Sequence, residues 1–205
     1  MITEFFSFPI IEEIIDINRE DLIDFSYNLK QNNLGTKRSN VFSFQSDNID
    51  LELPVLGPLI HNILQQCNIM HNFIGLKKNL KPKMGNLWFN IHPKGGANIP
   101  HSHPGSYFSG VYYPKCDENS GKLFFIHPAS NFEYHNNKYT IDNFTIKNGA
   151  RAVVVPQNNK LVIFDSSIYH KSDGLGTLES PRLIQTFFFR EIKTGLFPLN
   201  ESNRI

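Results

Sequence analysis

The feature that most constrains the fold is a series of short runs of aromatic and β-branched residues that begins after Pro82, each bounded by turn-forming residues. Such side chains pack well on the pleated, half-buried surface of a sheet. Many short strands at this spacing are typical of a β-sandwich or β-barrel rather than of a βαβ fold. The predicted strands cover residues 86–91, 107–113, 122–126, 152–155, 161–164 and 183–189.

Two amphipathic helices are predicted before these strands. Apolar residues recur at helical spacing over residues 12–30 and, more regularly, over residues 54–74. Pro54 suits the first turn of the second helix, because proline lacks only a donor that would be unpaired there in any case. Residues 37–52, which connect the two helices, are polar and irregular. The fold class is therefore expected to be mainly β with N-terminal helices.

The length of 205 residues suits one well-packed domain. We expect a single domain over 1–205, with a helical N-terminal region over 1–80 and a β core over 84–192. Residues 129–143 are polar and lack periodicity, so they are interpreted as a long inserted loop, of a kind that often covers a site.

The charge pattern excludes two classes of partner. The chain has 20 basic and 19 acidic residues, a net charge of +1, and no long run of like charges. This is not the pattern of a nucleic-acid-binding protein or of a polybasic membrane anchor. The densest basic stretch, residues 77–83 with four lysines, is interpreted as a solvated turn.

Cys67 and Cys116 are the only cysteines, and neither belongs to a C-x-x-C motif. The first residues lack the features of a signal peptide, and no apolar stretch is long enough to span a membrane. We therefore expect a soluble cytoplasmic protein with reduced thiols. A homodimer is expected from general frequency alone.

Three histidines and an arginine form the most informative pattern. His101 and His103 alternate along an extended segment, so both imidazoles can face one ion. His170 follows the apolar run 161–164, and Arg182 lies twelve residues further. Imidazoles are good Fe(II) ligands that leave coordination positions open, and an arginine can bind a carboxylate bidentately. The H-x-H motif alone is a weak signal, but the joint pattern is stronger.

Together with neighbouring motifs, these residues resemble the 2-oxoglutarate- and Fe(II)-dependent oxygenases. The resemblance covers residues 39–190 and is strongest to a prolyl-hydroxylase-like group found in bacteria, cyanobacteria and phages. It implies a double-stranded β-helix, or jelly roll. The matching motifs are SNVFSFQS at 39–46, WFN at 88–90, HSHP at 101–104, SGVYY at 109–113, GKLFF at 121–125 and LVIF at 161–164, followed by His170 and Arg182.

The resemblance also implies roles for individual residues. His101, His103 and His170 would be the Fe(II) ligands. Arg182 would bind the 5-carboxylate of 2-oxoglutarate, Tyr113 would hydrogen-bond the same group, and Asn90 is a weaker candidate for the co-substrate pocket. The implied activity is that of a dioxygenase that hydroxylates a small molecule or a protein side chain.

Two positions depart from the pattern of the wider superfamily. His103 occupies the place of the acidic ligand in the usual two-histidine, one-carboxylate triad. Either three imidazoles hold the iron, or another acid such as Asp165 or Asp173 completes the site. Ile184 stands where many relatives carry a hydroxyl, and Thr186 is the first hydroxyl in this chain.

Two alternatives to a 2-oxoglutarate-dependent oxygenase stay open. One is a cupin-like dioxygenase with a three-histidine iron site that acts on its substrate directly, in which Arg182 would bind the substrate. The other is a jelly roll that binds a metal or a small ligand without catalysis.

The remaining histidines are interpreted as structural or as surface residues. His92, His127 and His135 lie near predicted turns and are expected at the surface or in loops. His61 and His71 lie on the second predicted helix and are expected to be structural. Trp88 is expected to belong to the core rather than to a site.

Overall fold

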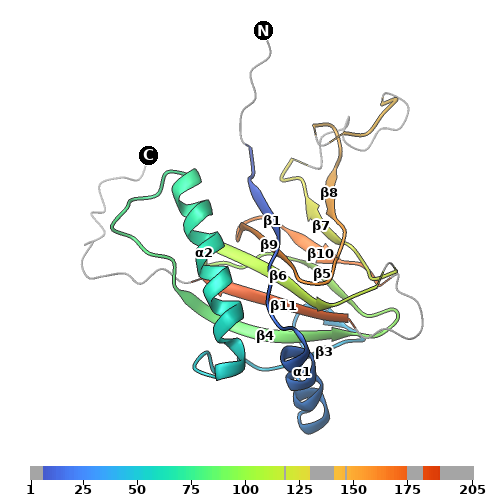
Figure 1. Ribbon diagram of the computed structural model, residues 1–205. Coiled ribbons are helices and arrows are strands. Elements are labelled where there is room, and N and C mark those ends of the chain that lie inside the picture. Colours follow the sequence, from blue (N-terminus) through green and yellow to red (C-terminus); the bar gives the residue numbers. More distant parts are fainter. Residues whose placement is uncertain (1–6, 118, 130–140, 146, 175–181, 190–205) are drawn as a thin grey trace, which may run out of the picture.

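The structure is a computed structural model that describes residues 7–117, 119–129, 141–145, 147–174 and 182–189, and only the backbone of the last stretch. The described residues form two antiparallel sheets (Figure 1). The larger sheet has the order β1-β9-β6-β11-β4-β3 and the smaller one has the order β2-β5-β10-β7-β8. The strands are β1 (Ile10–Ile14), β2 (Asn40–Val41), β3 (Phe44–Gln45), β4 (Met84–His92), β5 (Ala97–His101), β6 (Phe108–Lys115), β7 (Leu123–Ile126), β8 (Arg151–Val154), β9 (Lys160–Asp165), β10 (His170–Ser172) and β11 (Arg182–Phe189).

The strands from β4 to β11 make the jelly roll. In chain order they divide equally between the two sheets, with β4, β6, β9 and β11 in the larger sheet and β5, β7, β8 and β10 in the smaller one. Every strand pair is antiparallel. The prediction of a mainly β double-stranded β-helix with N-terminal helices is therefore confirmed.

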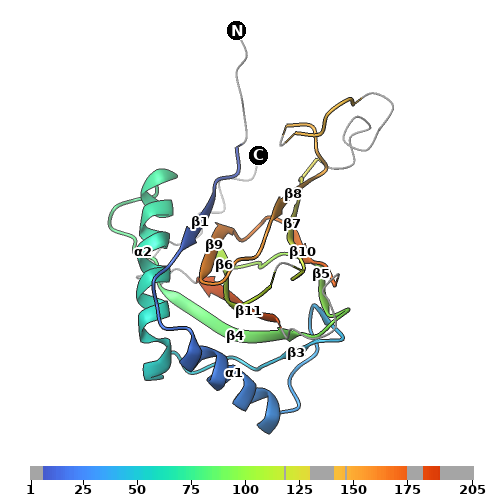
Figure 2. The same ribbon diagram turned by 45° about the vertical axis from the view of Figure 1, so that its right-hand side comes forward.

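The helices α1 (Glu20–Asn32) and α2 (Gly57–Phe73) cover the outer face of the larger sheet (Figure 2). A short 3-10 turn, Pro54–Leu56, leads into α2, so the second helix lies where it was predicted. No helix among the described residues combines the length and the apolar character needed to cross a bilayer.

Alternation along the strands divides the core into two parts. On β6, Phe108 and Tyr112 face the helices and pack with residues of α2 such as Leu59 and Ile63. Val111 and Tyr113 face the interior between the two sheets. A β-strand directs successive side chains to opposite faces, so one strand serves both layers.

The N-terminal helix is shorter than predicted. Residues 10–14 form β1, which pairs with β9 from Ile10↔Phe164 to Ile14↔Lys160, and α1 begins only at Glu20. The predicted helix start at residue 12 was wrong because the isoleucines in this segment extend the sheet edge. The region 37–52 contains β2 and β3. Most of the predicted loop 129–143 lies outside the described residues.

Candidate metal centre

Three imidazoles converge at one end of the space between the sheets. His101 ends β5, and His170 begins β10 directly opposite it in the sheet register. His103 lies two residues beyond the end of β5. One ligating nitrogen from each residue lies within 4.8 Å of the others, and the Nε2 atoms of His103 and His170 are 3.1 Å apart.

The loop that carries His103 is attached to the turn that precedes His170. The backbone N–H of His103 donates to the carbonyl oxygen of Ser166, and the N–H of Ser166 donates to the carbonyl oxygen of Tyr107, at 2.9 and 3.0 Å. The buried hydroxyls of Ser166 and Ser109 are 2.7 Å apart. His103 was expected on an extended strand, but it is positioned by these contacts with Ser166 instead.

Backbone carbonyl groups set the tautomers of two of the imidazoles. Nδ1 of His101 lies 2.7 Å from the carbonyl oxygen of Ile99, and Nδ1 of His170 lies 3.0 Å from that of Ile168. A carbonyl oxygen only accepts, so each Nδ1 carries the hydrogen. The lone pair of each Nε2 is therefore available to a metal ion.

Burial keeps the cluster uncharged. Desolvation lowers the pKa of His103 to about 2, with further lowering by the neighbouring His170 and His101. Desolvation, followed by the charge of His101, lowers the pKa of His170 to about 4. Burial also lowers the pKa of His101, against the effect of its bond to Ile99. At neutral pH all three rings are thus in the form that binds metals.

The donor set fits a metal ion without a carboxylate. Two nitrogens about 2.1 Å from one ion and at right angles to each other are about 3 Å apart, close to the observed His103–His170 separation. Within the described part of the chain, the cluster contains no acidic residue. Asp165 instead accepts hydrogen bonds from the N–H and hydroxyl of Ser167, and Asp173 accepts one from the N–H of Lys122.

A pocket adjoins the histidine cluster. Its lining includes His101 and His170 at the cluster and two of the predicted co-substrate residues, Asn90 and Tyr113, on β4 and β6. Both of these residues are buried. The other lining residues are Ser39, Trp88, Asn98, Val111, Leu123, Lys171 and Ser172.

Arg182 is placed by its backbone alone. It begins β11 and pairs with His92 of β4, whereas Ile184 pairs with Asn90 and Thr186 with Trp88. Paired positions on neighbouring strands lie on the same face of a sheet. Position 182 therefore belongs to the face of the sheet that carries Trp88 and Asn90. Its partner on β4, His92, lies two residues beyond Asn90.

Two residues differ from their interpretation in the sequence. Trp88, expected only in the core, also lines the pocket, with its ring centroid 6.1 Å from that of His103. His92, expected at the surface, is completely buried, and its Nδ1 lies 2.5 Å from the hydroxyl of Ser43. The alternation of β4, with Trp88, Asn90 and His92 on one face, could have indicated both positions.

A jelly roll with three convergent imidazoles beside a pocket is the arrangement in which non-haem iron can be held with open coordination positions. Residues 86–183, from β4 to the start of β11, match the family described as "Putative 2OG-Fe(II) oxygenase". The matched core of the chain contains all three histidines and is similar to that family. No curated protein sequence matches the chain significantly.

Solved structures with the same fold have low sequence identity to this chain. A prolyl-4-hydroxylase from Pseudomonas putida is 16% identical, with 88% of this chain and 91% of that one covered and a TM-score of 0.60. The non-heme alpha ketoglutarate dependent epimerase SnoN from nogalamycin biosynthesis is 12% identical, with coverages of 96% and 90% and a TM-score of 0.61. HygX from Streptomyces hygroscopicus, solved with nickel and 2-oxoglutarate bound, is 11% identical, with coverages of 91% and 83% and a TM-score of 0.57.

Proposed function

We propose that this chain is a 2-oxoglutarate- and Fe(II)-dependent dioxygenase that hydroxylates a second substrate, with His101, His103 and His170 as the iron ligands. The observation that carries the proposal is the convergence of three uncharged imidazoles, two of which line an adjoining pocket, in a family-matched jelly roll. Bound Fe(II) would supply the activation of O2, coupled to oxidative decarboxylation of 2-oxoglutarate to succinate and CO2.

The residues along β4 and β6 would bind and orient the keto acid. Trp88 lies beside His103, and Asn90 and Tyr113 line the same pocket. Position 182 pairs with His92, which lies two residues after Asn90 on β4. Side chains on one face of a strand recur about every 6.8 Å. Bound 2-oxoglutarate would thus lie parallel to β4, with its chelating keto-acid end at the histidines and its 5-carboxylate at Arg182 and Tyr113. Trp88 and Val111 would keep water from the reacting end.

The missing carboxylate ligand has an electrostatic consequence. Three neutral imidazoles leave the full charge of Fe(II) uncompensated in a buried site, which is unfavourable. A dianionic keto acid would neutralise that charge. We therefore expect 2-oxoglutarate to tighten Fe(II) binding by at least about tenfold and Fe(II) to tighten 2-oxoglutarate binding equally, because coupling between two ligands is reciprocal.

Anaerobic titration of the metal-free protein with Fe(II), with and without 2-oxoglutarate, tests the proposal. A weak visible charge-transfer band that forms only with the keto acid, and succinate release after O2 is admitted, would support it. Iron binding with no response to 2-oxoglutarate would favour the cupin-like three-histidine dioxygenase. Binding of both with no succinate would favour a ligand-binding jelly roll.

Further parts of the proposal concern the substrate, the assembly and the location. The substrate is a small molecule or a protein side chain, and product analysis by mass spectrometry after incubation with metabolite and peptide pools distinguishes these. A homodimer stays a prediction that light scattering tests. A cytoplasmic location stays a prediction that cell fractionation tests.

A further inference from the structure

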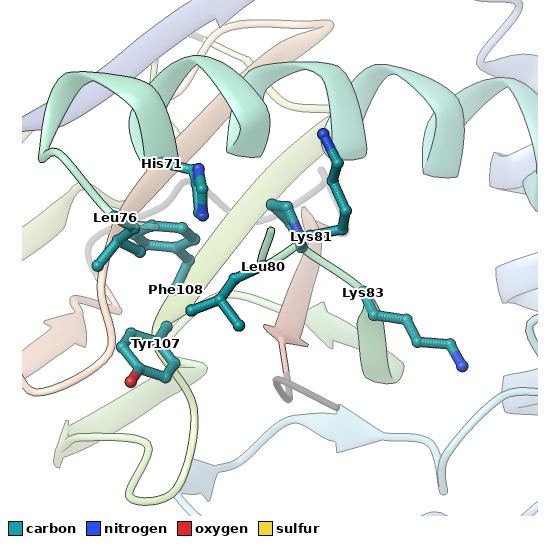
Figure 3. A pocket seen from close by; sticks show the side chains of 8 residues that line it. His71, Leu76, Leu80, Lys81, Lys83, Tyr107 and Phe108 are labelled. Carbon is teal, nitrogen blue, oxygen red and sulfur yellow. The ribbon is translucent and has the colours of Figure 1, made fainter. Parts of the chain in front are cut away.

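A second hollow lies on the opposite side of the larger sheet from the histidine cluster. It is bounded by the C-terminal half of α2, the connection between α2 and β4, and the start of β6 (Figure 3). Leu76, Leu80 and Phe108 form most of its apolar wall. Its enclosed free volume is about 30 Å³, which suits a small polar head group, and it opens to solvent on one side, so the rest of a ligand can extend along the apolar wall.

One polar side chain points into this hollow. The ring of His71 projects from α2 into the space between Leu76, Leu80 and Phe108 (Figure 3). The side chain is buried, with only 5% of His71 exposed, and its Nε2 has no hydrogen-bond partner within the described part of the chain. Buried nitrogen atoms of this kind are nearly always paired, so the position calls for a polar group from outside the protein.

The charges around the hollow specify the sign of that group. Residues 53–116 contain six lysines and no aspartate or glutamate, and four of the lysines lie within residues 77–83. Two of them, Lys81 and Lys83, line the hollow. Within the described part of the chain, neither lysine forms an ion pair. The nearby Asp165, which pairs with Phe108 in the sheet, already accepts two hydrogen bonds from Ser167, so the two lysines leave an excess of positive charge at the hollow that attracts anions.

We propose that this hollow is a binding site for a small apolar carboxylate, of the size of a short-chain monocarboxylate. One carboxylate oxygen accepts a hydrogen bond from His71 in the tautomer that carries the hydrogen on Nε2. The alkyl part packs against Leu76, Leu80 and Phe108, and the lysines of residues 77–83 provide long-range attraction. The site is separate from the proposed iron site, because Phe108 faces the helices whereas Ser109 faces the space between the sheets.

NMR titration of the metal-free protein with isobutyrate tests this site independently of iron. We expect a saturable shift of the His71 ring nitrogen signal, identified by its loss in His71→Gln. The neutral isostere isobutyramide should bind at least about tenfold more weakly, since a hydrogen bond to a charged group is worth more than one to a neutral group. Salt should weaken isobutyrate binding.

Variants separate the ligand site from a purely structural histidine. His71→Gln and the double variant Lys81→Gln/Lys83→Gln should each weaken isobutyrate binding, and Leu80→Trp, which fills the hollow and retains His71, should abolish it. His61→Ala, on the exposed side of the same helix, is the matched control and should bind normally. Absence of saturation, equal binding of isobutyramide, or unchanged binding in Leu80→Trp would overturn the proposal.

Discussion

The Nε2 atoms of His103 and His170 lie 3.1 Å apart, although 67 positions separate the two residues in the chain. The separation is set by the contacts of Ser166 with the His103 loop and by the pairing of β5 with β10. A metal ion bound here would join two distant segments. Because such an ion binds only the folded state, it should also stabilise the fold in proportion to its affinity.

Removing His170 should abolish iron loading without unfolding the protein. In His170→Ala two imidazoles remain, and they do not complete a tridentate face. We expect iron content below about one tenth of the wild-type value by elemental analysis, and loss of the thermal stabilisation that Fe(II) gives the wild type.

The matched control for this variant is His61→Ala, because His61 is exposed on α2. It should load iron normally. Full iron content in His170→Ala would remove this residue from the proposed ligands.

Replacing Arg182 should affect the co-substrate far more than the metal. In Arg182→Ala we expect the apparent KM for 2-oxoglutarate to rise by at least about tenfold, with nearly unchanged Fe(II) occupancy, because a bidentate arginine–carboxylate contact is lost. Succinate release at varied 2-oxoglutarate measures this. Arg151→Ala, on the exposed side of β8, serves as the control. An unchanged KM in Arg182→Ala would show that Arg182 is not part of the pocket.

The hydroxyl pair Ser109–Ser166 should be strongly coupled energetically. Either single alanine substitution leaves one fully buried hydroxyl without its partner, at a cost of about 1–3 kcal/mol in the free energy of unfolding. The double variant leaves no unpaired hydroxyl, so it should cost less than the sum of the two single variants. Urea denaturation of the four proteins measures the coupling. Strict additivity would contradict the contact.

The metal-free protein should lose stability in mild acid. The pKa of His170 is about 4 and that of His103 about 2 in the folded state, against 6.5 for an ordinary histidine. At a pH between the folded-state pKa of each histidine and 6.5, that histidine binds a proton in the unfolded chain but not in the folded chain. The stabilisation is therefore complete above pH 6.5 and declines as pH falls, by up to about 1.4 kcal/mol per pH unit for each histidine.

Urea denaturation in the presence of a chelator, at pH 7 and at pH 5, measures this effect. His103→Ala should show a smaller difference between the two conditions, since it has one fewer buried imidazole. Equal stability of the wild type at both values would mean that the rings take up protons without unfolding.

The strands of the core were predictable because their alternation is strong, and the predicted strands at 161–164 and 183–189 lie within β9 and β11. The strand β1 was missed because Ile14 also fits the helical spacing of residues 12–30, and only pairing with β9 decides the outcome. Strand β10 has three residues, which is too short for any periodic signal.

At the candidate site, the residue types and their order in the chain were predictable from the sequence. The contacts that position these side chains were not. The contacts of Ser166 with the His103 loop are mostly made by backbone groups. Backbone contacts do not require particular residue types, so the sequence does not indicate them. The burial of His92 depends on Ser43, 49 positions earlier in the chain. Such long-range contacts become apparent only in three dimensions.

The carbonyl groups of Ile99 and Ile168, each two residues before a histidine, align the rings of His101 and His170. These two rings obtain their orientation from the main chain and need no carboxylate or amide side chain to hold them. Residues around the pocket can therefore be exchanged to accommodate a different substrate without a change in the orientation of these two rings. Engineering of new specificity in this scaffold can thus begin at the pocket walls, with the alignment of His101 and His170 left intact.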